Sequence, residues 1–158
     1  MTIIEVNSKK TIGQFHQLPF QIYKNDKNWI PHIQQEVEAV FTPNQNKFFR
    51  HGEAIRWMLK DTDGKIIGRI AAFINRKKAF SEKQATGGCG FFECIDNQEA
   101  ANLLFNTAKQ WLSEREMEAM DGPINFGERD RYWGLLVNGH EKAPIYGNAY
   151  QPAYYQSL

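Results

Sequence analysis

The spacing of apolar residues changes several times along the chain, and each change predicts a different element. Residues 54–60 alternate between apolar and polar side chains, which is the period of a strand. A turn sequence at 61–64 follows, and alternation resumes over residues 65–75, so a β-hairpin is predicted. One face of the second strand is expected to be entirely apolar, and the other to carry Arg69. The apolar face is expected to hold Ile66, Gly68, Ile70, Ala72 and Ile74.

A second strand signal leads directly into a helix. Within residues 87–95, Phe91 and Phe92 stand side by side without polar alternation, so this strand is predicted to be buried on both faces and central in the sheet. After a turn at residues 96–97, apolar positions recur at helical spacing and predict one long amphipathic helix. Its apolar side consists of Leu103, Leu104, Ala108, Trp111 and Leu112.

The rest of the pattern completes a mixed α and β order. The further predicted elements are a strand at 2–6, a helix capped by Thr11 whose first part ends at Pro19, a helix from Pro31 through Phe41, a basic loop at 76–78, and strands at 119–126 and 145–155. No repeat or linker divides the chain. It is therefore expected to form one α/β (α+β) domain over residues 1–158, with a mixed central sheet flanked by helices.

Composition narrows the class of protein. The chain has 158 residues and a net charge of +1, which argues against a nucleic-acid-binding or anionic-membrane surface. The first residues lack a signal-peptide pattern and no stretch is long enough for a membrane span, so a cytoplasmic protein is predicted. Cys89 and Cys94 are five positions apart and should point to opposite faces of their strand, without a disulfide between them. The four histidines show no paired spacing, so no metal site is predicted.

Five stretches of the sequence carry a resemblance to a known fold family. They are Tyr23-Lys24-Asn25-Asp26 followed by Trp29-Ile30-Pro31, Ile67-Gly68-Arg69-Ile70-Ala71-Ala72, Gly90-Phe91-Phe92-Glu93-Cys94, Gly122-Pro123-Ile124-Asn125-Phe126-Gly127, and Tyr150-Gln151-Pro152-Ala153-Tyr154-Tyr155. With the order of elements, they resemble the acyl-CoA N-acyltransferase (GNAT) superfamily, and more narrowly a bacterial GNAT-like family. Members of that family are typically longer, with a second GNAT-like half. The chain therefore resembles an N-terminal half, and a second GNAT-like domain or another copy is its implied partner.

The resemblance implies a reaction and roles for named residues. The implied activity is transfer of an acyl group from acyl-CoA or acetyl-CoA to a small-molecule amine. Glu93 would be the general base, and Tyr146 or Tyr150 the general acid. The strand carrying Phe91, Phe92 and Cys94 would lie against the cofactor, and backbone N–H groups of residues 89–93 would hold the thioester carbonyl.

The residues themselves leave alternatives open for these roles. Glu93 could be buried among aromatic side chains, which would raise its pKa toward a useful range, or it could lie at the strand end, solvated or paired with Arg69 across the sheet. Tyr146 and Tyr150 would also serve as packing residues of a core or an interface. A GNAT-shaped module without catalysis, which binds a ligand or a second domain, is the competing hypothesis.

One departure from the GNAT pattern bears on cofactor binding. Acyltransferases of this fold carry a glycine-rich loop after the central strand, whose N–H groups hold the coenzyme A diphosphate. Residues 94–101 contain no glycine and no arginine. Asp96 and Glu99 instead have the spacing of a capping box, which would satisfy those N–H groups internally and repel a phosphate. A closed helix cap is therefore predicted where a phosphate site is expected.

A polar and aromatic loop is the last candidate. It follows the Gly122-Pro123 break and could line a cleft, where an arginine would bind a carboxylate or phosphate and a tryptophan would stack on a ligand. An ion-paired surface loop anchored by one tryptophan explains the same pattern. The predicted ligand or partner residues are Asn125, Glu128, Arg129, Arg131 and Trp133.

Overall fold

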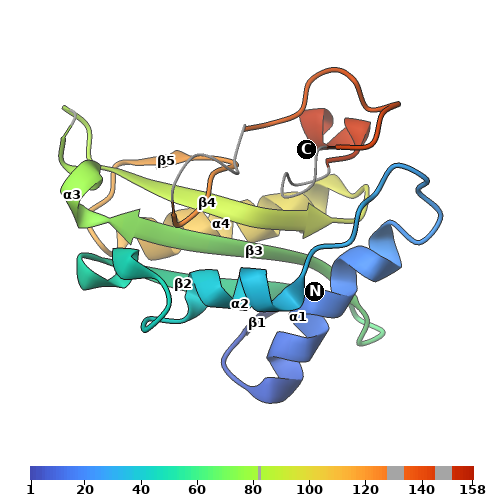
Figure 1. Cartoon of the computed structure of the whole chain (residues 1–158), viewed down its shortest axis with the longest axis horizontal. Helices are drawn as coiled ribbons and strands as arrows, with labels where there is room; N and C mark the ends of the chain where they lie inside the picture. The colour runs from blue at the N-terminus through green and yellow to red at the C-terminus, as the bar shows by residue number, and fades with distance from the viewer. Residues whose placement is uncertain (82, 128–133, 145–150) are drawn as a thin grey trace.

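The computed structural model describes residues 1–81, 83–127, 134–144 and 151–158. Its centre is a five-stranded sheet in the order β1-β2-β3-β4-β5 (Figure 1). All neighbouring pairs are antiparallel except β4 and β5, which are parallel. The strands are β1 (Thr2–Glu5), β2 (Gly52–Lys60), β3 (Ile66–Asn75), β4 (Thr86–Cys94) and β5 (Ala119–Asp121). The predicted mixed sheet is confirmed, but its middle strand is β3 and not β4.

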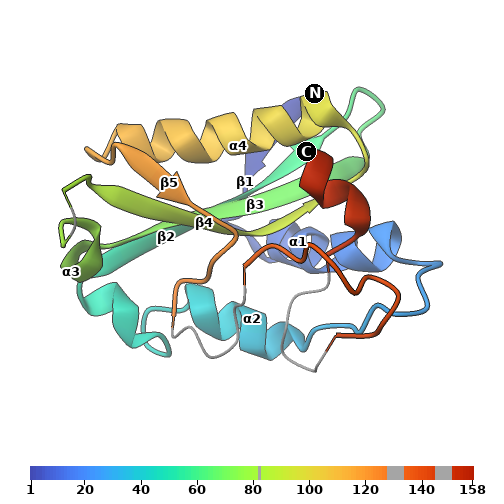
Figure 2. The same ribbon diagram turned by 90° about the horizontal axis from the view of Figure 1, so that it is seen from above.

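Helices cover both faces of this sheet (Figure 2). The long helix α4 (Gln98–Ser113) lies on one face, and α1 (Lys9–Ile22) and α2 (Gln34–Phe41) lie on the other. Short helices complete the order. They are the 3-10 helix η1 (Lys47–Arg50), α3 (Arg76–Ala79) and the C-terminal 3-10 helix η3 (Ala153–Ser157). None of the helices in the described ranges combines the length and the apolar character of a membrane span.

The predicted long helix and its apolar side are confirmed. Leu104, Ala108 and Leu112 are buried against β3 and β4, and Leu103 is partly buried. Small residues on the strands permit this close approach: a Cβ on Gly68 would lie 2.6 Å from Leu104, and one on Gly87 would lie 2.4 Å from Leu112. The face toward α4 is thus a tightly packed apolar core.

Helix α1 differs from its prediction at Thr11 and at Pro19. Its N-cap is Ser8, whose hydroxyl accepts from the Thr11 N–H, while Thr11 occupies the third helical position and completes a capping box. Pro19 lies inside the helix and does not end it. Proline has no N–H, so the Phe15 carbonyl four residues earlier loses its helical partner. The Arg69 guanidinium donates to that carbonyl at 2.6 Å, so a side chain from β3 replaces the missing bond.

Four other boundaries also differ. The second helix begins at Gln34 and not at Pro31, the predicted basic loop at 76–78 lies in α3, and the strand predicted at 119–126 stops at Asp121, before the Gly122–Pro123 bond. The described part of the C-terminal strand prediction ends in η3. Proline and tyrosine in these segments fit several conformations, so local pattern alone did not distinguish them.

Candidate functional site

A β-bulge in β4 decides which residues face the site. Ala71 pairs with Gly90 and Arg69 pairs with Glu93, so two residues of β4 oppose one of β3 in between. Phe91 has φ of 52° at this point, which reverses the alternation of all later side chains. Glu93 therefore lies on the same face as Arg69. The bulge also brings Cys89 and Cys94 into one core cluster, so the prediction that they lie on opposite faces is wrong.

Glu93 is buried and held by three side chains from distant parts of the chain. The Tyr23 hydroxyl donates to Oε2, and the Tyr155 hydroxyl donates to the same oxygen at 3.0 Å. Arg69 Nη2 lies 3.5 Å from Oε1. Glu93 is thus both buried and paired with Arg69, two features that the sequence had suggested as alternatives.

The two tyrosines reach Glu93 from opposite ends of the chain. Tyr23 caps the C-terminus of α1, where its N–H donates to the Pro19 carbonyl at 2.9 Å. Tyr155 lies in η3, and its hydroxyl oxygen also accepts the Cys94 N–H at 2.9 Å. Neither tyrosine was predicted as a site residue. Their separation from Glu93 by 70 and 62 positions gave no local signal.

Burial dominates the acid–base properties of this cluster. It raises the pKa of Glu93, an effect opposed by the Arg69 charge and by the hydrogen bonds from the two tyrosines. Burial and the nearby Glu93 charge also raise the pKa of Tyr23 and of Tyr155. The tyrosines are therefore neutral hydroxyl donors at neutral pH, next to a carboxyl group that binds a proton more readily than usual.

The outer edge of β4 is covered by three different segments in turn. β5 pairs only with residues Thr86 to Gly88. The Ile124 N–H then donates to the Cys89 carbonyl at 2.9 Å. At the end of the strand, η3 takes over: the Tyr154 hydroxyl donates to the Cys94 carbonyl at 2.6 Å, while Tyr155 accepts from the N–H of the same residue. Figure 2 shows η3 beside this end of β4.

The turn between β4 and α4 is capped, but not by the predicted residue. Asn97 is the N-cap of α4, and its Oδ1 accepts the Ala100 N–H at 2.8 Å. The prediction that Asp96 forms a capping box with Glu99 is wrong by one position. Glu99 nevertheless lies in the first turn of the helix, where its charge interacts favourably with the helix dipole.

The three predicted cofactor-contacting residues are divided between the two faces of the sheet, with Phe91 on one and Phe92 and Cys94 on the other. Phe91 packs on the α1 and α2 face, with its ring 4.9 Å from that of Phe41. Phe92 stacks on Phe105 of α4 at 4.5 Å. Cys94 is fully buried, and burial raises its thiol pKa to about 12, so it is no nucleophile at neutral pH. Contact of these residues with a cofactor stays a prediction.

Most of the predicted ligand loop lies outside the described residues. This applies to Glu128, Arg129, Arg131, Trp133, Tyr146 and Tyr150. Asn125 is described: its side chain is partly buried, and its Oδ1 has no hydrogen-bond partner within the described ranges. The predicted roles of this loop and of the two tyrosines stay predictions.

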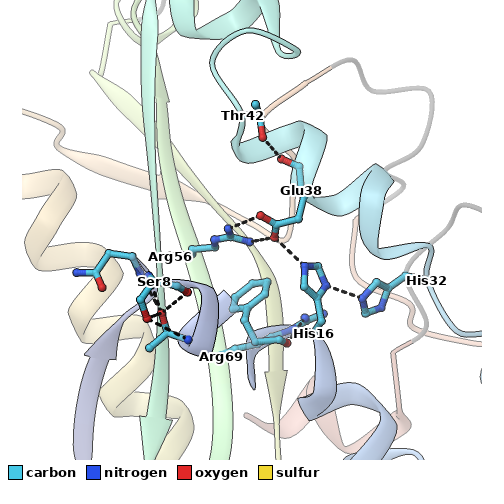
Figure 3. Close-up of polar contacts among 10 residues, drawn as sticks. Ser8, His16, His32, Glu38, Thr42, Arg56 and Arg69 are labelled. Carbon is cyan, nitrogen blue, oxygen red and sulfur yellow. Dashed lines mark hydrogen bonds and ion pairs between the residues drawn. The ribbon is translucent and has the colours of Figure 1, made fainter. Parts of the chain in front are cut away.

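A second buried polar network lies on the same face of the sheet (Figure 3). Arg56 of β2 holds both carboxylate oxygens of Glu38, at 2.5 and 2.8 Å. Glu38 lies 2.7 Å from His16 Nε2, and His16 Nδ1 lies 3.0 Å from His32 Nε2. Sequence reasoning found none of these pairings. Among the described residues, no group of three or more side chains is arranged to hold a metal ion.

Comparison with known proteins gives one relative in sequence and several in structure. No protein-family model matches the chain. Protein YghO from Escherichia coli is 28% identical over 137 residues, which are 87% of this chain but only 34% of that protein. The chain thus spans about a third of the length of the curated relative it matches.

Solved structures match at the level of the fold. The acetyltransferase AAC(6')-Iy, solved with a CoA-containing bisubstrate analogue, gives a TM-score of 0.54 at 14% identity over 78% of this chain and 79% of its own. A GNAT-family acetyltransferase from Staphylococcus aureus gives 0.50 at 12% identity, over 75% and 69%. At these identities the similarity concerns the fold alone. The described residues therefore have the acyl-CoA N-acyltransferase (GNAT) fold.

Proposed function

We propose that this chain performs the amine-handling part of an acyltransferase-type reaction, with Glu93 as the proton acceptor. The observation that supports the proposal is the buried Glu93, Tyr23, Tyr155 and Arg69 cluster on the bulged strand of a GNAT fold. A primary amine must lose a proton when it attacks an acyl carbonyl. A carboxylate with a raised pKa accepts a proton near neutral pH more effectively than an ordinary one.

The neighbours of Glu93 have defined parts in this proposal. Arg69 keeps a positive charge beside the carboxylate, which limits the rise in its pKa and keeps a fraction of it ionised. Tyr23 and Tyr155 retain their protons and donate to the carboxylate. They fix the direction of its remaining lone pairs, and each provides a hydroxyl that can return a proton to a leaving group. In this proposal they take the acid role predicted for Tyr146 and Tyr150.

The β4–α4 turn does not fit the diphosphate of coenzyme A. The side chain of Asn97 already occupies the Ala100 N–H, and residues 94–101 offer no glycine at which a phosphate could approach the backbone. Asp96 and Glu99 add negative charge there. No step of the proposal therefore passes through a cofactor held at this turn. In this proposal acyl-CoA is contacted by residues outside this turn; the matched relative is longer than this chain, and the match covers 34% of it.

A second candidate is a GNAT-shaped binding module without catalysis. It is favoured by the covered edge of β4, where Tyr154 and Tyr155 occupy the carbonyl and the N–H of Cys94. A strand edge that is already hydrogen-bonded has fewer groups left for a ligand backbone. In this case the Glu93 cluster fixes η3 to the sheet, and a second domain or another copy of the chain is the partner.

The two candidates are separated by one set of measurements. Thiol release from acetyl-CoA is followed with a panel of primary amines, for wild type and for Glu93→Gln, which keeps the shape of the side chain. Loss of a general base should reduce turnover by roughly 10²–10⁴-fold. Glu53→Gln is the matched control, because Glu53 pairs with Arg76 and Arg115 at the other end of the sheet. Unchanged turnover in Glu93→Gln excludes Glu93 as the base.

Cofactor binding is measured separately by thermal shift with coenzyme A and acetyl-CoA. A ligand present at a hundred times its Kd stabilises a protein by about 2.7 kcal/mol, which is easily detected. A shift would show that the chain binds the cofactor in spite of the capped turn. Absence of both a shift and turnover at millimolar cofactor supports the binding module.

A further inference from the structure

The hydrogen bonds of the Arg56, Glu38, His16 and His32 network determine where its protons lie. Glu38 is held by both guanidinium nitrogens of Arg56, and these bonds, with His16, keep its pKa low even though burial acts in the opposite direction. As a carboxylate it can only accept, so the His16 Nε2 that lies 2.7 Å away must carry a proton.

The protonation of His16 in turn determines which ring nitrogen of His32 carries the proton. Burial lowers the pKa of His16, so the ring is neutral at pH 7 and has a single N–H. That proton is on Nε2, so Nδ1 has a lone pair and accepts from His32 Nε2 at 3.0 Å. His32 is neutral as well, since burial and the charge of Arg69 lower its pKa to about 4. Its Nδ1 must therefore have an unprotonated lone pair.

The position of His32 leaves that lone pair available. Within the described ranges, His32 Nδ1 has no hydrogen-bond partner, and the ring is only half-buried. The Phe20 ring lies beside it, 6.0 Å from the His32 ring, and Trp29 packs edge-on against the Phe20 ring at 4.9 Å. Figure 3 shows His32 as the outer end of the series that begins at Arg56.

We propose that His32 Nδ1 is the proton-accepting atom of a ligand site, oriented by His16 and Glu38, for an uncharged hydroxyl or amine on an aromatic or apolar group. The inference does not depend on Glu93 or on acyl transfer. A cationic ligand is disfavoured, because the charge of Arg69 acts on His32 from β3 and Glu38 is already neutralised by Arg56. The aromatic neighbours favour a ligand with an apolar body. His16 and Glu38 are positioning residues, since they act through His32.

The proton arrangement is tested by two-bond ¹H–¹⁵N spectra of the histidine rings at pH 7. His32→Gln assigns the His32 signals by their loss. We expect wild-type His32 to be protonated at Nε2 and unprotonated at Nδ1, as a single tautomer. A His32 ring that is protonated at Nδ1, or doubly protonated, overturns the proposal. The tautomer is read from the spectra of the wild-type protein, and the variant serves only to assign the His32 signals.

The positioning role is tested by Glu38→Gln, which keeps the size of the side chain but can either donate or accept. His32 should then populate both tautomers, with averaged ¹⁵N shifts. An unchanged single tautomer excludes Glu38 as the positioning group. His51→Gln is the matched control, because His51 precedes β2 and lies outside the network, against Phe48. It should leave the His32 signals as they are.

The ligand class is tested with benzyl alcohol and its methyl ether, which differ in having a hydroxyl proton. Benzyl alcohol should change the ¹⁵N shift of His32 Nδ1 in a saturable manner, and the ether, which has no proton to donate, should change it much less. Equal changes with both compounds, or no change with either, overturn the assignment of a hydrogen-bonding site to His32.

Discussion

The two faces of the sheet both bury apolar side chains, but they differ in the polar and charged groups that are buried with them. Toward α4, the buried side chains are apolar: Leu104, Ala108 and Leu112 pack on Ile70, Ala72 and other strand residues. Toward α1 and α2, the buried side chains include His16, Arg56, Arg69 and Glu93. Buried charge costs free energy unless it is paired, whereas buried apolar area stabilises directly. The first face can thus account for stability, and the second for function.

Phe15 shows how the polar face is made compatible with folding. Its ring lies between two guanidinium groups, with Arg56 Cζ 5.0 Å and Arg69 Cζ 4.4 Å from the ring centre. Each arginine also has a carboxylate partner, Glu38 or Glu93. The aromatic ring provides a favourable surface for both cations while it separates the two networks. Each arginine is therefore paired with its own carboxylate, and the four charged groups do not form one common cluster.

The largest expected effect comes from removing one charge on the polar face. Arg69→Ala leaves Glu93 and the Phe15 carbonyl without their guanidinium donor. Breaking a buried ion pair from one side should lower the free energy of unfolding by about 3–5 kcal/mol. Urea unfolding measures this loss. A loss below about 1 kcal/mol, the usual range of an exposed pair, would contradict the contrast between the faces.

The matched change on the apolar face is Leu104→Ala, at a fully buried position. It should cost about 2–5 kcal/mol through lost transfer energy and a cavity. Its cost should be the same at pH 5 and pH 8, because no titrating group lies in that cluster near those values. The cost of Arg69→Ala should change over this interval, since Glu93 has a raised pKa.

A smaller effect concerns the pH dependence of stability. The folded-state pKa of His32 is about 4, below the ordinary histidine pKa of 6.5, so the unfolded chain binds more protons between these values. Stability should therefore fall as pH is lowered from 6.5 to 4, and His16 and Glu38 act in the same direction. The raised pKa of Glu93 acts oppositely, because there the folded form binds the extra proton.

His32→Gln should therefore reduce the loss of unfolding free energy that occurs as the pH is lowered from 6.5 to 4. One proton accounts for at most ~1.4 kcal/mol per pH unit, and solvent screening of this half-buried ring reduces that slope. Urea midpoints measured from pH 4 to pH 7 give the result. His140→Gln is the control, because its ring contacts Gln151 and Gln156 away from the network. Identical slopes for wild type and His32→Gln would show that His32 is not neutralised by folding.

The smallest expected effect distinguishes the observed helix cap from the predicted one. Asn97→Ala removes the acceptor of the Ala100 N–H and should cost about 1 kcal/mol. Asp96→Ala should change stability by less than ~0.5 kcal/mol, as is usual for surface substitutions. Chemical denaturation of both variants measures the difference. A larger loss from Asp96→Ala would restore Asp96 as the capping residue.

The sequence predicted those features that depend on neighbouring residues. The helix α4, the β2–β3 hairpin and the presence of a helix cap before α4 all follow from the spacing of residues close in sequence, as periodic patterns do. The alternation in β3 was predicted less well at its start: Ile66 belongs to the polar face and Ile67 to the apolar one, because the register shifts next to Lys60. Such irregularities leave little trace in composition.

The candidate site was predicted in part, through Glu93 and Arg69. Its remaining members depend on contacts that no local pattern contains. Tyr23 was used only as part of a stretch that resembles the GNAT family, without a role at the site, and His16 and His32 were not expected to pair with each other or with Glu38. What brings them together is tertiary packing of α1 and η3 on the sheet. Pro19 is a local signal for one of these contacts, the bond from Arg69 to the Phe15 carbonyl. A proline inside a helix always leaves one carbonyl to be satisfied elsewhere.

The extra residue at Phe91 determines on which face of the sheet each later side chain of β4 lies. Side chains of a strand alternate with a period of two, so removing one residue there would exchange the two faces from that point on. The Glu93 carboxylate would turn toward Leu104, and the Cys94 thiol toward the tyrosines. A single-residue deletion at this bulge would thus alter the molecule more than most substitutions. Chain length at one point, and not only side-chain identity, therefore keeps the Glu93 carboxylate on the sheet face toward α1 and α2.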